Sequence, residues 1–473
     1  MVISARARSL LGHVGVVVVF VVLTVKAAAP LHNTDTYFHL RFGHEFLTGH
    51  WSLSDPGAVT TFATADWVPT QWLSEVVMAQ LERWFGLAGV AWLSGLLFLT
   101  LAVTLYWCCR RVAEPIVCAV ALALVLIACT PGISMRPQVV SYVLVSLTAA
   151  LWLGARTSGR TPWLLVPLTW VWTMCHGMWP LGILVGLVAV LGLSLDRAHP
   201  PRVLLRMLAV PLLSAAAALL TPAGPGLALA VVRVTSRSRY FHEWRPTDFH
   251  EPYALVLLAL LALAVVPRLR GGEPASWFEV GLIGLAVLLA VYTTRTVPVS
   301  ACLAAPLAAG GVQMGLRPRL GTPPTVPLRE RLAVLSAYAA ALAVLAVLVP
   351  HTADRPADAH SWLDAELGDL PDGTVVLDEI GFGGYLMWRF PQLDVVQNGY
   401  GDSYTDDELE RNADVEEVRG GWLEDVKSFH AAYAVLPPGS PLAYSLREVE
   451  HWEVVEQGED LQLLAPPAGW YDS

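Results

Sequence analysis

The segment LGHVGVVVVFVVLTVKAAAP, residues 11–30, is almost wholly apolar and is as long as a membrane-crossing helix. A helix that spans the hydrocarbon core of a bilayer needs about 20 such residues, within a range of ~17–25. No small-residue cleavage site followed by a soluble chain comes after it, so we do not expect a cleaved secretion signal. The segment predicts a first transmembrane helix.

Further apolar segments follow along the chain and predict eleven spans in all. The pair at 162–175 and 178–195 is short, and one long tilted helix through His176-Gly177 is the alternative to two spans. The ten later spans are expected at 86–107, 115–130, 138–154, 162–175, 178–195, 206–222, 254–266, 276–292, 297–315 and 332–350.

The overall composition agrees with a multi-span membrane protein. Of 473 residues, 55% are hydrophobic and only 15% are charged, whereas a soluble domain carries about 25% charged residues. The mean hydropathy is +0.52. The basic residues form no single patch, which excludes a nucleic-acid partner. All six cysteines lie in the apolar part, so no disulfide framework or zinc spacing is expected in the polar segments.

Charge is distributed unevenly and divides the chain into two regions. Residues 1–350 hold 14 acidic and 24 basic side chains, whereas residues 351–473 hold 26 acidic and 6 basic ones. We expect a mainly α fold, with a polytopic helical bundle at 1–350, including an external loop at 31–83, and an acidic extracytoplasmic α/β domain at 351–473. Its strand-like runs are Thr374–Leu377, Val395–Gln397, Ala432–Leu436, Trp452–Val455 and Leu461–Leu464.

Arginine in the short loops predicts the orientation. Arg6 and Arg8 precede the first span, and basic residues follow every even-numbered span. Lys and Arg are enriched in cytoplasmic loops. We therefore expect a protein of the bacterial plasma membrane with its N-terminus in the cytoplasm. Because the number of spans is odd, the acidic C-terminal domain is expected outside.

The external loop 31–83 is long, polar and rich in aromatic residues. Its second half, from Gln71 to Trp84, has apolar residues at helical spacing, which predicts an amphipathic helix on the membrane surface. Asp35 lies just beyond the first span, where a carboxylate meets both lipid head groups and water. Carboxylates take up protons and guanidinium groups bind phosphate bidentately. The other polar side chains expected on this outer face are Glu75, Arg136, His176, Glu243 and Arg295.

The motif Asp35-Thr36-Tyr37-Phe38-His39-Leu40, with Arg41 and Gly43, resembles the first-loop motif of the polytopic GT-C class of glycosyltransferases, and more closely a largely uncharacterised bacterial subgroup of GT-C-like proteins. That subgroup usually has an Asp-Gly-Arg-like segment in its C-terminal region, whereas this chain has Asn398-Gly399-Tyr400-Gly401-Asp402 there. If this segment contacts the substrate, the substrate specificity of this protein should differ. Further motifs follow in the same order: Trp67, Gln71-Trp72-Leu73-Ser74-Glu75, Arg136-Pro137-Gln138, His176-Gly177, Glu243-Trp244, Arg295 and Gly383-Gly384-Tyr385-Leu386.

This resemblance implies an enzyme that moves a sugar from a polyprenyl-phosphate or -diphosphate donor to an acceptor at the outer membrane face. Asp35 would be its catalytic carboxylate, because the attacking hydroxyl must lose a proton. Arg136 and Arg295 would contact the phosphate, with Glu75, His176 and Glu243 as further substrate-binding candidates. A divalent metal could also stabilise the leaving phosphate, but no metal ligand is assigned.

Other interpretations of the same residues stay open. Asp35 could cap a helix, Glu75 could be structural, Arg136 could anchor a helix end at the lipid head groups, and His176 could form a tight turn with Gly177. The whole protein could instead be a non-catalytic scaffold for envelope assembly, or a transporter or flippase. A transporter should carry ionisable residues near the middle of its spans, and this chain has almost none.

Overall fold

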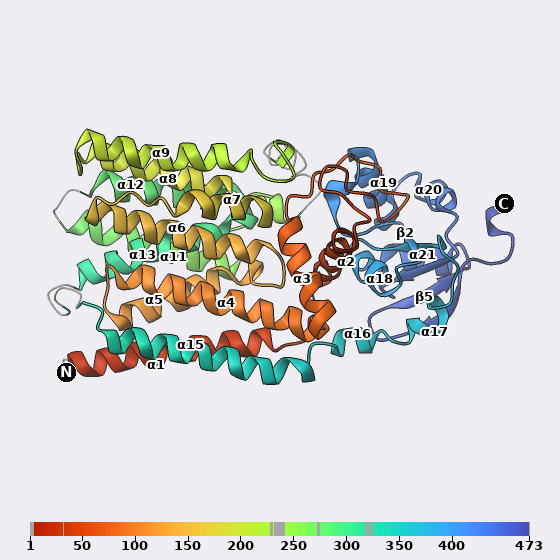
Figure 1. Cartoon of the computed structure of the whole chain (residues 1–473). Helices are drawn as coiled ribbons and strands as arrows, with labels where there is room; N and C mark the ends of the chain where they lie inside the picture. The colour runs from red at the N-terminus through yellow and green to blue at the C-terminus, as the bar shows by residue number, and fades with distance from the viewer. Residues whose placement is uncertain are drawn as a thin grey trace. The chain divides into compact units, whose positions relative to one another are not determined.

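The computed structural model describes residues 4–31, 33–227, 230, 242–271, 275–316, 320 and 325–472. The chain forms two compact units. The helical unit comprises residues 1–29 and 91–350, and the mixed unit comprises residues 30–90 and 351–473. The sequence placed the loop 31–83 with the membrane domain, whereas its contacts in the structure are mostly with the C-terminal segment. Figure 1 shows the elements of each unit.

Each of the eleven predicted spans coincides with a helix. Seven of the described helices are long and apolar enough to cross a membrane, and four of the predicted spans form shorter apolar helices. The short segments predicted at 162–175 and 178–195 form two separate helices and not one long helix. The first ends at Cys175 and the second begins at Pro180. The helices are α1 (Ala5–Ala27), α4 (Leu87–Arg110), α5 (Pro115–Ala128), α6 (Gln138–Ser158), α7 (Leu165–Cys175), α8 (Pro180–Leu195), α9 (Pro201–Ala218), α11 (Pro252–Arg270), α12 (Trp277–Tyr292), α13 (Val297–Gly315) and α15 (Leu328–Leu348).

Helix α13 lies at the centre of the helical unit. Its most apolar window is 83% buried, compared with 17% for the window that includes α15. Its sequence, VPVSACLAAPLAAGGVQMG, is dominated by small residues, which let neighbouring backbones approach closely in a membrane. At Gly311 a Cβ atom would lie 2.1 Å from the carbonyl oxygen of Leu263 in α11. Any larger residue at Gly311 would therefore force the two helices apart.

Ion pairs join helix ends at the end of the helical unit that carries the N-terminus (Figure 1). Arg110 of α4 binds Glu330 of α15 at 2.6 Å, and both side chains are buried. Since an unpaired buried charge is costly, these pairs fix which helix ends are neighbours. The other pairs are Arg8 with Glu114, and Arg156 and Arg268 with Glu279.

The mixed unit contains a five-stranded sheet in the order β2-β1-β3-β5-β4. β1 (Val375–Asp378) is parallel to both β2 (Asp394–Val395) and β3 (Tyr433–Leu436). β5 (Gln462–Ala465) is antiparallel to β3 and to the exposed edge strand β4 (Glu453–Gln457). All five predicted strands are present within a few residues. The helices of this segment are α16 (Arg355–Ala359), α17 (Leu363–Leu367), α18 (Gly383–Arg389), α19 (Asp406–Glu416), α20 (Trp422–Phe429) and α21 (Pro441–Glu448).

The first loop contributes two helices to the mixed unit, α2 (Asp35–Thr48) and α3 (Trp72–Phe85). The second is the helix predicted from Gln71 to Trp84. The two helices cross closely at Gly43, where a Cβ atom would lie 2.2 Å from the carbonyl oxygen of Glu75. Between them, Thr61 donates its backbone N–H to Asp394 at 3.0 Å and its hydroxyl to the same carboxylate at 2.5 Å. The loop is therefore hydrogen-bonded to the edge strand β2.

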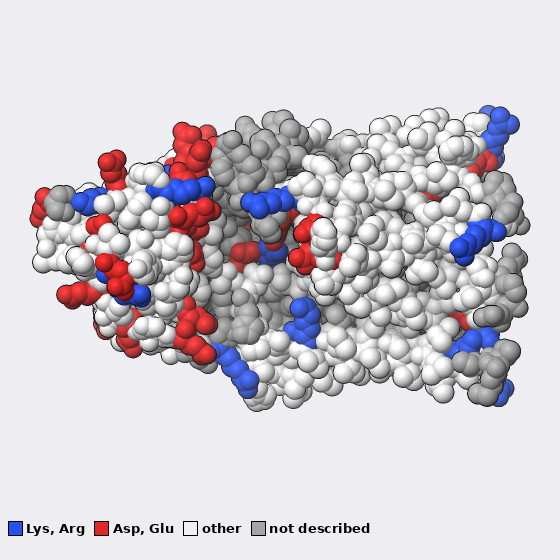
Figure 2. Space-filling model, turned by 180° about the vertical axis from the view of Figure 1, so that it is seen from behind, with Lys and Arg blue, Asp and Glu red and all other residues white. Residues whose placement is uncertain are grey.

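The surfaces of the helical unit and the mixed unit differ in charge and polarity. Figure 2 shows acidic side chains gathered on the mixed unit, while the helical unit has a broad uncharged surface with basic side chains at its end. Large apolar side chains are exposed along its outer helices, for example Val18, Leu205 and Leu288. Such a surface is stable only when it is covered by lipid. The protein is therefore a multi-pass membrane protein.

Candidate active site

Three predicted site residues form one cluster in the helical unit. Arg136, just before α6, donates from Nη2 to Oε1 of Glu243 at 2.6 Å. Nη1 of Arg295 lies 3.5 Å from the other carboxylate oxygen, Oε2. Glu243 belongs to the short 3-10 turn His242–Trp244, and Arg295 to the turn Thr294–Thr296 between α12 and α13. A single carboxylate thus lies between two guanidinium groups that come from different loops.

The electrostatics of this cluster favour the charged forms. Burial by itself would raise the pKa of Glu243, but Arg295 and Arg136 outweigh burial and hold it below its ordinary value. Arg295 also lies over the Trp244 ring, with its guanidinium carbon 4.9 Å from the ring centroid, a favourable cation–π arrangement. Two positive charges and one negative charge leave the cluster with a net positive charge. The cluster is therefore suited to binding an anion.

His176 extends the cluster into the protein interior. Arg295 Nη2 lies 3.4 Å from His176 Nε2. Since a guanidinium can only donate, a hydrogen bond between these atoms requires Nε2 to accept, which places the imidazole proton on Nδ1. Nδ1 lies 2.8 Å from the Ser141 hydroxyl, which also accepts from Trp172 Nε1 at 2.7 Å. The buried Ser141 therefore fixes the imidazole orientation.

Asp35 belongs to the mixed unit and is the first residue of α2. The N-cap position is occupied by Thr34, and the Asp35 backbone N–H donates to the Asn33 side chain at 2.9 Å. The Asp35 carboxylate is therefore not at the capping position, and its side chain is partly exposed. An acidic group in the first turn still gains from the helix dipole.

Glu75 is fully buried between α2 and α3. Its Oε1 lies 3.0 Å from Nδ1 of His39, which is also buried. Its Oε2 has no hydrogen-bond partner among the described residues, and burial raises the pKa of this carboxyl well above its ordinary value. In this structure the side chain faces His39 rather than solvent.

The structure therefore brings together Arg136, His176, Glu243 and Arg295, and separately pairs Glu75 with His39. Sequence reasoning missed Ser141 and Trp172. Ser141 lies three residues after Gln138, about one turn along α6, so the two residues share a helix face. This spacing from the Arg136-Pro137-Gln138 motif is the sequence signal that could have identified Ser141. Within the described part of the chain, no group of three His, Cys, Asp or Glu side chains could hold a metal ion.

No protein-family model and no curated protein matches this chain. Several solved structures share its fold, and they include the following two. The apo oligosaccharyltransferase of Archaeoglobus fulgidus aligns with 90% of this chain and 69% of its own, at a TM-score of 0.54 and 12% identity. Apo ArnT from Cupriavidus metallidurans aligns with 97% of this chain and 98% of its own, at a TM-score of 0.52 and 16% identity. These are GT-C glycosyltransferases, so the chain has a GT-C-like fold.

Proposed function

We propose that this protein transfers a sugar from a polyprenyl-phosphate or polyprenyl-diphosphate donor to an acceptor at the outer face of the bacterial plasma membrane. The observation that carries the proposal is the position of Arg136 and Arg295 on either side of one carboxylate. Guanidinium groups are the preferred side chains for recognising phosphate bidentately. The GT-C-like fold supports the same reaction class.

The proposed chemistry assigns a separate role to each group. The acceptor hydroxyl attacks the anomeric carbon of the sugar, and Asp35 takes up the proton that this hydroxyl loses. The bond between the anomeric carbon and the donor phosphate oxygen breaks, and the lipid phosphate leaves with that electron pair. Arg136 and Arg295 stabilise the charge that develops on the leaving phosphate. Ser141 and His176 hold Arg295 in position, so they are positioning residues.

The variant Asp35→Asn tests the catalytic role. Its amide has the size of the carboxylate but cannot take up a proton, and loss of a general base typically lowers the rate by ~100- to 10,000-fold. The helix should be affected little, because the first-turn charge contributes only about 0.3–1 kcal/mol. The measurement is consumption of a lipid-linked sugar together with a thermal melt.

Asp66→Asn is the matched control, because Asp66 is an exposed carboxylate of the same loop. It should keep normal turnover. Normal turnover of Asp35→Asn with normal stability would exclude Asp35 as the base. Lost turnover with retained binding of the donor lipid would support the assignment and would exclude the scaffold alternative.

A further inference from the structure

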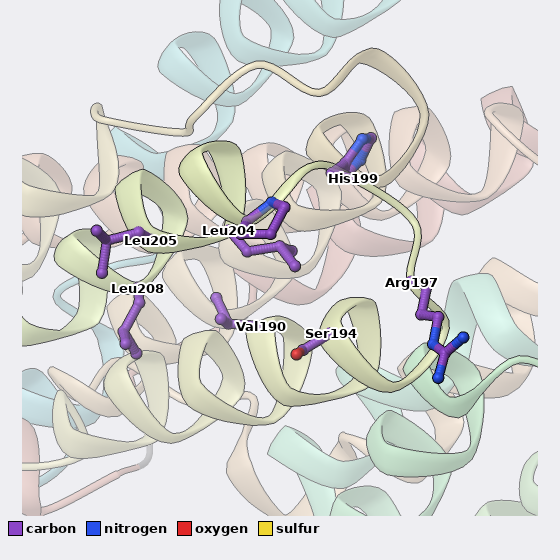
Figure 3. Close-up of a pocket in the computed structure, with 8 residues that line it drawn as sticks. Val190, Ser194, Arg197, His199, Leu204, Leu205 and Leu208 are labelled. Carbon is purple, nitrogen blue, oxygen red and sulfur yellow. The ribbon is translucent and has the colours of Figure 1, made fainter.

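A groove opens between the end of α8 and the start of α9 (Figure 3). Its turn contacts Arg156 near the C-terminal end of α6, whereas Arg136 precedes the N-terminal end of that helix. The groove has a volume of about 550 Å³ and is open on one side. Leu204, Leu205 and Leu208 line it from α9, and Val190 lines it from α8. Leu205 is 69% exposed, so this wall of the groove faces the space that lipid chains fill.

The other end of the groove is polar. Ser194, Arg197 and His199 lie at the turn between the two helices. His199 Nε2 donates to the backbone oxygen of Arg156 at 3.0 Å, which fixes the turn and leaves Nδ1 facing away from that bond. The groove is therefore amphipathic along its length, with apolar walls on the two helices and donors at the helix ends.

The basic side chains at this turn have no acidic partner in the described part of the chain. Arg197 and Arg202 are exposed and form no ion pair with any residue that the structure describes. The neighbouring carboxylate, Asp196, instead accepts from the backbone N–H groups of Trp277 and Phe278 at 2.6 and 3.1 Å. By contrast, Arg156 and Arg268 at the same end of the unit share Glu279. Arg197 and Arg202 outnumber Asp196, so the turn carries a net positive charge beside an apolar groove.

We infer that this groove binds an anionic phospholipid of the surrounding bilayer. One acyl chain lies against the leucines of α9, and the phosphate binds at Arg197 and at the first turn of α9. That turn adds the positive end of the helix dipole. A zwitterionic lipid would satisfy the apolar walls but would leave the positive charge uncompensated. The selectivity should therefore be for negative headgroups, as for basic pockets at the ends of other membrane helices.

The test is native mass spectrometry of the full-length protein with added phosphatidylglycerol or phosphatidylcholine. The double variant Arg197→Gln/Arg202→Gln should lose phosphatidylglycerol binding by about fivefold for each arginine and should keep phosphatidylcholine binding. The control is Arg160→Gln/Arg331→Gln, which removes two exposed arginines outside the groove. Equal losses in the two double variants would overturn the proposal, because only bulk charge would then matter.

A second pair of variants tests the apolar wall. Leu205→Trp should fill the groove and reduce phosphatidylglycerol binding at least severalfold, whereas Leu212→Trp on the same helix should not. Both leucines are largely exposed, at 69% and 57%, so neither change disturbs the core. Unchanged lipid binding in Leu205→Trp, or identical binding of the two lipids by the unmodified protein, would show that the groove holds no selective lipid.

Discussion

Nη2 of Arg136 lies 2.6 Å from Oε1 of Glu243, so this nitrogen of the guanidinium is already bonded to a carboxylate. The other oxygen of the same carboxylate faces Arg295. In the reaction we propose, a phosphate that reaches the two arginines would have to displace Glu243 or share them with it. We infer that Glu243 keeps the arginines in place in the absence of substrate.

The first prediction follows from this competition. Glu243→Gln removes the charge that competes with phosphate, so affinity for polyprenyl phosphate should rise by up to about fivefold, since partly exposed ion pairs contribute ~0.2–1 kcal/mol. Arg136→Gln should lower the affinity by about tenfold or more. Titration of the purified protein with the lipid measures both effects. Weaker binding by Glu243→Gln would show that Glu243 contributes to the lipid site instead of competing for it.

The second prediction concerns the buried hydroxyl of Ser141. Ser141→Ala leaves both the His176 Nδ1–H and the Trp172 Nε1–H without an acceptor, at a cost of ~1–3 kcal/mol for each buried donor. The melting temperature should fall clearly. Ser146→Ala is the matched control in α6, because the Ser146 hydroxyl only adds a second bond to the carbonyl of Tyr142. Equal melting temperatures of the two variants would contradict the tautomer and the network assigned to His176.

The third prediction concerns the pH dependence of the mixed unit. Asp378 at the end of β1 is fully buried, and burial raises its pKa well above the ordinary value, with Glu416 and Glu379 nearby adding to the effect. Its contribution to stability is therefore complete at low pH and is lost as pH rises through the raised pKa. Asp378→Asn should be more stable than the unmodified protein at neutral pH.

The measurement is the difference in melting temperature between the Asp378→Asn variant and the unmodified protein across pH 4–8. This difference should grow with pH, by roughly 2–4 °C for each kcal/mol of stabilisation. Other carboxyl groups have pKa values that are raised or lowered equally in both proteins. Their effects on the melting temperature therefore cancel in the difference, as long as they do not contact Asp378. A constant difference at every pH would show that Asp378 keeps an ordinary pKa.

The fourth prediction concerns the attachment of the first loop to the sheet. Thr61→Val removes the hydroxyl and Asp394→Ala removes the carboxylate of one hydrogen-bonded pair, in which Asp394 is only 8% exposed. A double-mutant cycle on thermal stability should give a coupling of ~0.5–3 kcal/mol. The more exposed pair Thr64 and Glu408 provides the control and should couple more weakly. No coupling between Thr61 and Asp394 would contradict the folding of residues 30–90 with the C-terminal segment.

The secondary structure of this protein was predictable because its signals are local. Long apolar segments located all eleven predicted helices, and short alternating or β-branched runs located the five strands. The break between α7 and α8 was the hardest feature to predict, because its signal is not local hydropathy. Both segments are shorter than a usual span, and hydropathy alone does not show where a helix ends.

The sequence by itself also determined which residue types could form a site, since Arg136, His176, Glu243 and Arg295 were candidates from their loop positions alone. Only the tertiary structure decided their partners, because each comes from a different helix end and no spacing along the chain encodes a contact across 107 or 119 residues. The same holds for Thr61 and Asp394, which are 333 residues apart. Burial is likewise a property of the packed chain. Glu75 is a polar residue on a predicted surface helix, and only its packing against α2 shows that its carboxylate lies in the protein interior.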